Sequence, residues 1–261
     1  MSGFDVARCS VLITGASSGI GREFARQLAG HAGALVLVAR RLDRLEELRG
    51  ELTKKDPNLR VLCRAVDLSQ QHHVDQLSAW LASEGMAIDF LINNAGLGDR
   101  GSFAEAEPER VREILAVNVV ALTRLTHALL PAMITRKRGA ILNVSSIAGF
   151  MPIRTMATYA ASKAYVTSFS EAIRGEVRKA GITVTAVCPG PVTTEFSDVA
   201  QRASGKREQP SPGFMHVAVE DVVRAGLRAV AQGKPIVVPG VVMKIAMLLV
   251  RLTPMAILRR V

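Results

Sequence analysis

The stretch TGASSGIG, Thr14–Gly21, follows the apolar run SVLIT (10–14) and opens a helical pattern near 19–30. Its glycines stand at 15, 19 and 21, which differs from the common G-x-G-x-x-G spacing. Residues without a Cβ permit a tight turn and let a pyrophosphate approach backbone N–H groups at a helix N-terminus. A strand, a glycine-rich turn and a helix in this order indicate a site for such a group.

Apolar, β-branched runs alternate with amphipathic segments along the chain. The runs predict strands at 10–14, 34–39, 60–65, 88–93, 140–145, 182–187 and 235–240. Helical patterns lie near 19–30, 43–54, 70–84, 108–136, 157–179 and 219–232. Near-continuous apolar strands separated by helices are typical of a parallel sheet covered on both faces. The pattern predicts the α/β class, with right-handed crossovers that give a single doubly wound domain, 1–261.

Length and composition agree with one large domain. The chain has 261 residues, of which 49% are hydrophobic, enough for a substantial core. Cys9, Cys63 and Cys188 are far apart in apolar runs and have neither disulfide nor zinc spacing. No histidine constellation supports a metal site. The N-terminus lacks the layout of a signal peptide, so we expect a cytoplasmic location.

The net charge of +10 is spread along the chain, and only 4% of the residues are aromatic. Nucleic-acid binding would gather basic residues in one stripe, with aromatic residues interleaved for stacking. A solvated basic surface is therefore favoured over a nucleic-acid site.

Two segments depart from the alternating pattern. Residues 190–216 are polar and rich in Gly, Pro and Ser, which predicts a flap beside the substrate rather than core. The C-terminal segment 241–261 is apolar, but Lys244, Arg251 and Pro254 interrupt it too early for a bilayer span of about 20 residues. It either packs on protein, at a subunit or beside the pocket, or makes peripheral contact with a membrane interface.

The sequence YAASK places Tyr159 one helical turn before Lys163, so both side chains project from one helix face. One reading is a ring packed on a lysine stem. The other is a phenol whose acidity is set by a neighbouring ammonium.

Six motifs in order resemble the short-chain dehydrogenase/reductase family: TGASSGIG, NNAG (93–96), Asn118, the serine pair 145–146, YAASK and PGPVTT (189–194). The resemblance runs from about residue 10 to 195. It implies a Rossmann-type domain with a mainly seven-stranded parallel sheet flanked by helices, in agreement with the strands predicted above.

The resemblance also implies a catalytic set made of Asn118, Ser146, Tyr159 and Lys163. Tyr159 would exchange a proton with the substrate, with its pKa lowered from about 10 toward 7 by Lys163 and by the oxidised nicotinamide. Ser146 would hydrogen-bond the carbonyl oxygen, with Ser145 as the second choice. Asn118 would hold a water in a proton relay from Lys163.

The same resemblance implies a set of cofactor contacts. Beyond Tyr159 and Lys163 these are Gly15, Ser17, Ser18, Gly19, Ile20, Gly21, Arg40, Asp67, Leu68, Asn94, Ala95, Gly96, Pro189, Gly190, Val192 and Thr194.

Cofactor type follows from the end of the second strand, ALVLVARR. An NAD site usually has an acidic residue there to bind the ribose hydroxyls, but this chain has Ala39 followed by Arg40 and Arg41. A guanidinium fits a 2′-phosphate. We therefore expect NADP(H) to be preferred over NAD(H).

These observations predict an NADP(H)-dependent oxidoreductase acting on a carbonyl or secondary alcohol, with a hydrophobic or acyl-type substrate. The family implies a homodimer or homotetramer. The alternatives are a non-catalytic dinucleotide-sensing or scaffold protein of the same fold, and a nucleic-acid-binding protein, whose binding would weaken steeply with salt.

Overall fold

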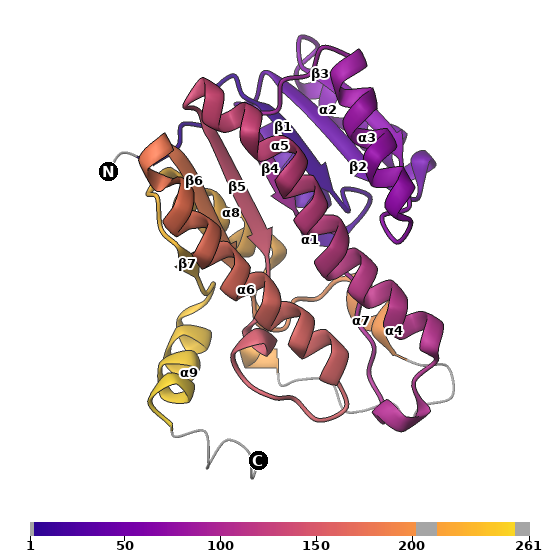
Figure 1. Ribbon diagram of the computed structural model, residues 1–261, viewed down its shortest axis with the longest axis vertical. Coiled ribbons are helices and arrows are strands. Elements are labelled where there is room, and N and C mark those ends of the chain that lie inside the picture. Colours follow the sequence, from indigo (N-terminus) through magenta and orange to yellow (C-terminus); the bar gives the residue numbers. More distant parts are fainter. Residues whose placement is uncertain (1–2, 202–212, 254–261) are drawn as a thin grey trace.

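A computed structural model describes residues 3–201 and 213–253, and the strands there form one parallel sheet (Figure 1). They are β1 (Ser10–Thr14), β2 (Ala34–Ala39), β3 (Arg60–Ala65), β4 (Phe90–Asn93), β5 (Gly139–Val144), β6 (Ile182–Val187) and β7 (Ile236–Val237). Their order is β3-β2-β1-β4-β5-β6-β7. Strand order reverses between β1 and β4, where open α/β sheets form a ligand crevice at the carboxyl ends. The predicted fold class is confirmed.

Helices cover both faces of the sheet, which explains why the central strands are buried along almost their whole length. On one face are α1 (Gly19–Leu28), α2 (Leu42–Lys55) and α8 (Val219–Ala231). On the other are α3 (Gln71–Ser83), the helical stretch 108–136 and α6 (Ala157–Val177), as Figure 1 shows. All six residues of β2 are buried, as are all six of β6. The two faces therefore bury separate hydrophobic clusters.

The helix predicted at 108–136 is not uniform. It consists of α4 (Pro108–Leu115), a π-helical stretch, η2 (Ala116–Ala121), and α5 (Leu122–Arg136). By length and composition alone these 29 residues could cross a membrane. A helix in the core of a folded domain passes the same test, and this one buries Ile114, Leu125 and Met133 against its own chain.

Other boundaries differ from the prediction. The seventh strand is only two residues long, because the apolar run 235–240 turns into the loop before the last helix. Segment 190–216 contains α7 (Glu195–Ala200) and a 3-10 turn, η5 (Gly213–Met215), while 202–212 lies outside the described residues. Further 3-10 turns are η1 (Phe103–Glu105), η3 (Ile147–Phe150) and η4 (Arg178–Ala180).

The apolar C-terminal segment begins with α9 (Val241–Leu252), and its residues 254–261 lie outside the described part. Met243 and Met247 are buried on the protein side of this helix. The opposite side exposes large apolar side chains, namely Val241, Val242, Ile245, Leu248, Leu249 and Leu252. One face of α9 therefore packs on its own chain, as one of the two alternatives requires, and the other face is left uncovered by the described residues.

Candidate active site

Ser146, Tyr159 and Lys163 meet at the carboxyl end of the sheet. Ser146 follows β5 and begins η3, while Tyr159 and Lys163 lie one turn apart on α6. The side chain of Ser146 stabilises the ionised form of the Tyr159 phenol, which opposes the effect of burial on its pKa. The Lys163 Nζ donates to the Val144 carbonyl oxygen at 2.9 Å and lies 5.7 Å from the centre of the Tyr159 ring. All three side chains are buried.

Ser145 has a different environment from its neighbour. Its Oγ donates to the Lys163 carbonyl oxygen at 2.8 Å and lies 2.7 Å from the Thr167 Oγ1. Successive residues of an extended chain point to opposite sides. Ser145 therefore anchors β5 to α6, and the geometry favours Ser146 as the serine that faces a substrate.

Asn118 lies in the π-helical stretch and joins two parts of the site. Its Oδ1 accepts from the Leu97 backbone N–H at 2.8 Å, and its Nδ2 donates to the Leu97 carbonyl and to the Ser162 Oγ, both at 2.9 Å. A Cβ added to Gly96 would lie 3.3 Å from the Lys163 Nζ and 3.5 Å from the Asn118 Oδ1. The amide thus fixes the chain after β4 against α6, and its water-holding role stays a prediction.

Burial dominates the ionisation of Tyr159 and Lys163. Burial raises the pKa of Tyr159 to about 12, opposed by the hydrogen bond with Ser146. Burial also lowers the pKa of Lys163 to about 8. Both groups are so deeply buried that the loss of hydration, which favours each neutral form, dominates their pKa values. The lowering of the phenol pKa by Lys163 together with the oxidised nicotinamide stays a prediction.

The buried amine has a measurable consequence for stability. The pKa of Lys163 in the folded protein is about 8, against 10.5 for an ordinary lysine exposed to solvent. Between those pH values the unfolded chain carries the proton and the folded protein does not, so folding becomes more favourable as the pH rises. Relative to Lys163→Met, the free energy of unfolding of the wild type should increase by up to about 3 kcal/mol across this range. Urea titrations at a series of pH values measure it, and parallel pH curves would contradict it.

The glycine turn fits the pyrophosphate of a dinucleotide. Gly15 and Gly19 have φ of +68° and +52°, in the left-handed region that favours glycine. A Cβ on Gly21 would lie 2.3 Å from the Gly15 carbonyl oxygen. Ser18, the N-cap of α1, makes no side-chain capping bond, and the first turn holds no acidic residue. The N–H groups at this end of α1 are therefore available to an anion.

The predicted contacts after β4 support this turn. The Asn94 Nδ2 donates to the Thr14 and Gly15 carbonyl oxygens at 2.9 and 3.3 Å, and the Asn94 and Ala95 N–H groups each donate to the Thr14 Oγ1 at 3.0 Å. The side chain of Asn94 is thus used to hold the turn. Ile20, by contrast, packs against the core.

The predicted adenosine contacts lie beyond β2 and β3. Leu68 is buried in the core on the α3 face. For Asp67, burial opposes ionisation, but hydrogen bonds from the Ser69 N–H and hydroxyl and the charge of Arg40 hold its pKa below the ordinary value. The charge of Arg40 thus helps to keep the Asp67 carboxylate ionised.

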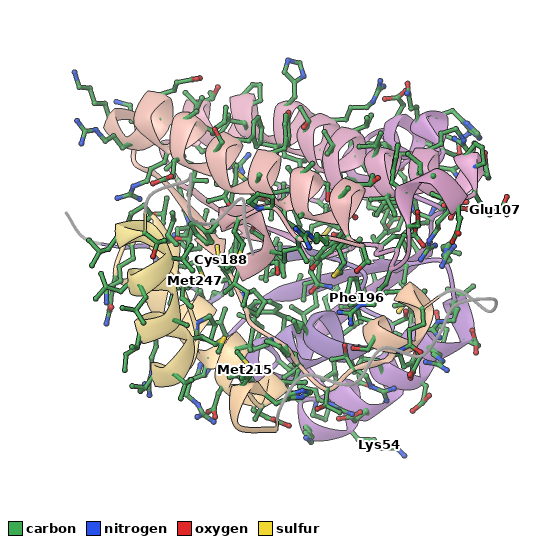
Figure 2. The ribbon with its side chains drawn as sticks, turned by 90° about the horizontal axis from the view of Figure 1, so that it is seen from below. Lys54, Glu107, Cys188, Phe196, Met215 and Met247 are labelled. Atoms are coloured by element: carbon green, nitrogen blue, oxygen red, sulfur yellow. The ribbon has the colours of Figure 1, made fainter. Side chains whose placement is uncertain are left out.

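Two residues of the predicted flap, Thr194 and Phe196, lie over the glycine turn and beside Tyr159. Thr194 caps α7 and stands above Gly19, where an added Cβ would come within 3.2 Å of its methyl group. The ring of Phe196, labelled in Figure 2, is centred 5.4 Å from that of Tyr159. Val192 packs against the core. A ring contact at this place excludes water from the phenol.

Pro189 and Gly190 connect β6 to this flap. The Ile147 N–H donates to the Pro189 carbonyl oxygen at 3.1 Å, and a Cβ on Gly190 would lie 2.7 Å from the Met243 Sδ. The buried face of α9 therefore forms an apolar wall beside the crevice.

Glu195 is not among the site residues predicted from the sequence. Its carboxylate is paired with Arg41 at 3.1 Å and with Arg44 at 2.5 Å. The Arg41 guanidinium also donates to the Ser17 Oγ at 3.3 Å. The alternation of charges along the sequence gives no signal for this contact, because about 150 residues separate its partners.

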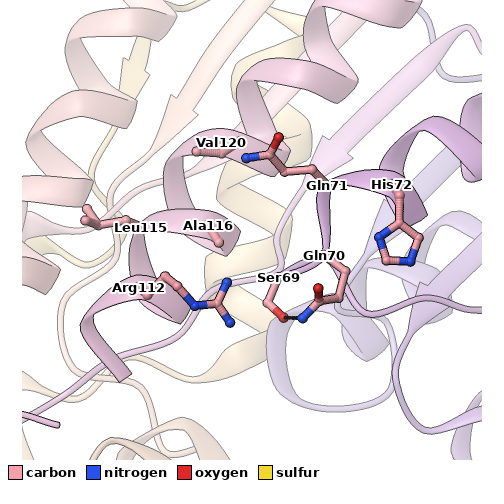
Figure 3. Close-up of a pocket in the computed structure, with 8 residues that line it drawn as sticks. All are labelled: Ser69, Gln70, Gln71, His72, Arg112, Leu115, Ala116 and Val120. Carbon is pink, nitrogen blue, oxygen red and sulfur yellow. Dashed lines mark hydrogen bonds between the residues drawn. The ribbon is translucent and has the colours of Figure 1, made fainter. Parts of the chain in front are cut away.

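A hollow of about 590 Å³ lies outside this cluster, between the start of α3 and the π-helical stretch (Figure 3). It is lined by Ser69, Gln70, Gln71, His72, Arg112, Leu115, Ala116 and Val120. Ser69 connects it to Asp67, whose carboxylate accepts from the Ser69 hydroxyl at 2.8 Å. None of its lining residues belongs to the predicted catalytic set, so it is not the place where Tyr159 meets a substrate.

Comparison with known proteins finds relatives that agree with one another in family. A family model described as short chain dehydrogenase matches residues 10–204. A very-long-chain 3-oxoacyl-CoA reductase from Pyrenophora tritici-repentis is 35% identical over 82% of this chain and 63% of that protein. The chain spans 58 to 63% of the length of the first curated relatives it matches.

Similar solved structures match nearly the whole length of this chain. A short-chain dehydrogenase from Sphingobium yanoikuyae in complex with NADPH is 31% identical, with a TM-score of 0.80, over 93% of this chain and 92% of that one. A short chain dehydrogenase/reductase from Burkholderia phymatum in complex with NAD is 26% identical, with a TM-score of 0.81, over 95% and 94%. These neighbours thus include both cofactor types.

Proposed function

The chain belongs to the short-chain dehydrogenase family, and from this premise we propose that it is an NADP(H)-dependent reductase of hydrophobic carbonyl compounds of the 3-oxoacyl type. The observation that carries the proposal is the buried cluster of Ser146, Tyr159 and Lys163 beside a glycine turn whose shape suits a pyrophosphate.

In this mechanism the nicotinamide cofactor supplies the hydride and, once oxidised, a positive ring. The α1 N-terminus would hold the pyrophosphate and Lys163 the nicotinamide ribose, while Arg40, with Arg41 and Arg44 nearby, would hold the 2′-phosphate. The hydroxyls of Ser146 and Tyr159 would both donate to the carbonyl oxygen, where negative charge develops. Hydride at carbon and a proton from the Tyr159 Oη at oxygen together convert the carbonyl to an alcohol.

The pKa of Tyr159 is compatible with its role as the acid in reduction. An alkoxide is more basic than a phenolate, so a phenol with a pKa of about 12 still donates its proton readily to it. Oxidation would instead require the phenolate at neutral pH. Lys163, with a pKa of about 8, remains largely protonated at pH 7 and can stabilise the phenolate that donation leaves behind.

Two observations support a hydrophobic substrate. The wall beside Gly190 comes from Met243 of α9, and thioether side chains adapt to apolar ligands of varied shape. In addition, the first curated relatives are named as very-long-chain 3-oxoacyl-CoA reductases. A small-molecule partner of this class therefore fits both the lining and the relatives.

A panel of carbonyl compounds tests the proposal. With NADPH, turnover should rise with acyl chain length among 3-oxoacyl thioesters and be slow for short or sugar-like ketones. NADH should be used at least about tenfold less efficiently, since one charge-assisted hydrogen bond to the 2′-phosphate accounts for that factor. Binding of NADPH without its oxidation on any compound would favour the non-catalytic sensor, and failure to bind either nucleotide would end the proposal.

A further inference from the structure

Glu195 stands at the start of α7 and reaches back to the opposite side of the nucleotide site. Its two carboxylate oxygens are shared between Arg41, at 3.1 Å, and Arg44, at 2.5 Å. Hydrogen bonds from Arg44 and then Arg41 hold the pKa of Glu195 below its ordinary value, so the group is an anion at neutral pH. Two guanidinium groups thus already bind one negative charge supplied by the chain itself.

Three further observations place this ion pair in the predicted nucleotide site. Arg41 donates to the Ser17 Oγ inside the glycine turn. Thr194, directly before Glu195, stands over Gly19. The charge of Arg40, directly before Arg41, helps to hold the pKa of Asp67, a predicted adenosine contact, below its ordinary value. Glu195 therefore lies at the ribose end of the cleft, where the 2′-phosphate of NADP(H) is expected.

We propose that Glu195 is a specificity-determining residue, which competes with the 2′-phosphate of the cofactor for Arg41 and Arg44. The inference rests on the proposed function and adds to it a residue outside the glycine turn and outside the end of β2. Position 39 holds no acid, but an acid from another element reaches the same region.

The ion pair is suited to exchange. The side chains of Glu195, Arg41 and Arg44 are 48, 41 and 36% exposed, and exposed pairs are individually weak. A phosphate carries more charge than a carboxylate and accepts bidentate hydrogen bonds from guanidinium. The 2′-phosphate can therefore displace Glu195 from the two arginines. The cofactor binds less tightly as a result, because the ion pair must be broken and because the displaced carboxylate repels the phosphate. A nucleotide without a 2′-phosphate avoids both effects.

The test compares adenosine 2′,5′-bisphosphate with adenosine 5′-monophosphate, by calorimetry on the intact protein. In Glu195→Gln the affinity for the bisphosphate should rise about two- to fivefold, the range of one exposed charge pair, while that for the monophosphate stays constant. The gain should shrink in high salt, because counterions screen exposed charges.

Glu47→Gln is the matched control. Glu47 is also an exposed carboxylate paired with an arginine, Arg22 at 2.7 Å, and its substitution removes the same charge without touching Arg41 or Arg44. Equal gains in both variants, or an equal gain for both nucleotides, would overturn the proposal, as would no gain at all. The wild-type ratio of the two affinities tests the NADP(H) preference separately. A ratio near one refutes that preference, whereas a high ratio left unchanged in Glu195→Gln refutes only the competition.

Discussion

Replacement of Tyr159 by phenylalanine is expected to lower kcat by about 10²- to 10⁴-fold, the usual contribution of one general acid. The ring would keep its buried position and its contact with Phe196, because only the hydroxyl is removed. Affinity for NADPH should therefore change little. Single-turnover kinetics and calorimetry measure the two quantities on the same preparation.

Tyr165→Phe is the control for this experiment. Tyr165 lies on the same helix, six residues later, and its hydroxyl is 2.9 Å from the Thr123 Oγ1 on the half-exposed surface of α6. Replacing Tyr165 by phenylalanine removes the same hydroxyl oxygen, but at a position outside the crevice, so activity should remain. Equal kcat values for the Tyr159 and Tyr165 variants would remove the phenol from the mechanism.

Substitution of alanine for Gly21 should weaken dinucleotide binding by at least about tenfold and destabilise the fold by about 1–3 kcal/mol, the usual cost of overpacking. The new Cβ would lie 2.3 Å from the Gly15 carbonyl oxygen and 2.4 Å from the Asn94 Nδ2. The Gly15 carbonyl oxygen belongs to the backbone and cannot move without opening the turn. Urea unfolding and nucleotide titration report the two effects.

The comparison variant is Gly50→Ala. Gly50 lies within α2, and nothing stands within 4 Å of a Cβ added there. Alanine is the better helix former by about 1 kcal/mol, so this variant should be slightly more stable than the wild type and bind nucleotide normally. A Gly21 variant that behaved in the same way would show that the turn can open without cost.

The layers of the fold and the glycine turn could be predicted from sequence because their causes are local. Six buried residues in ALVLVA specify a central strand, and glycines at 15 and 19 specify backbone conformations that other residues avoid. The spacing of Tyr159 and Lys163 likewise fixes one helix face. Each of these properties belongs to a few neighbouring residues.

What could not be predicted depends on distant partners. The pKa of Tyr159 is dominated by burial, which the sequence YAASK does not encode. The contact of Glu195 with Arg41 and Arg44 exists only once α7 has folded over the glycine turn. The seventh strand is short because its length depends on pairing with β6, which extends over two residues.

The π-helical stretch around Asn118 has a further consequence for how this segment can vary. Such a stretch holds one residue more than an α-helix of the same rise. Deleting one residue between 116 and 121 would let the helix wind regularly, with α4 and α5 keeping their faces, and would remove the widened turn in which Asn118 lies. Asn118 would then no longer face Leu97 and Ser162. Substitutions in this segment are therefore more readily accommodated than insertions or deletions, and its residue count is itself under constraint.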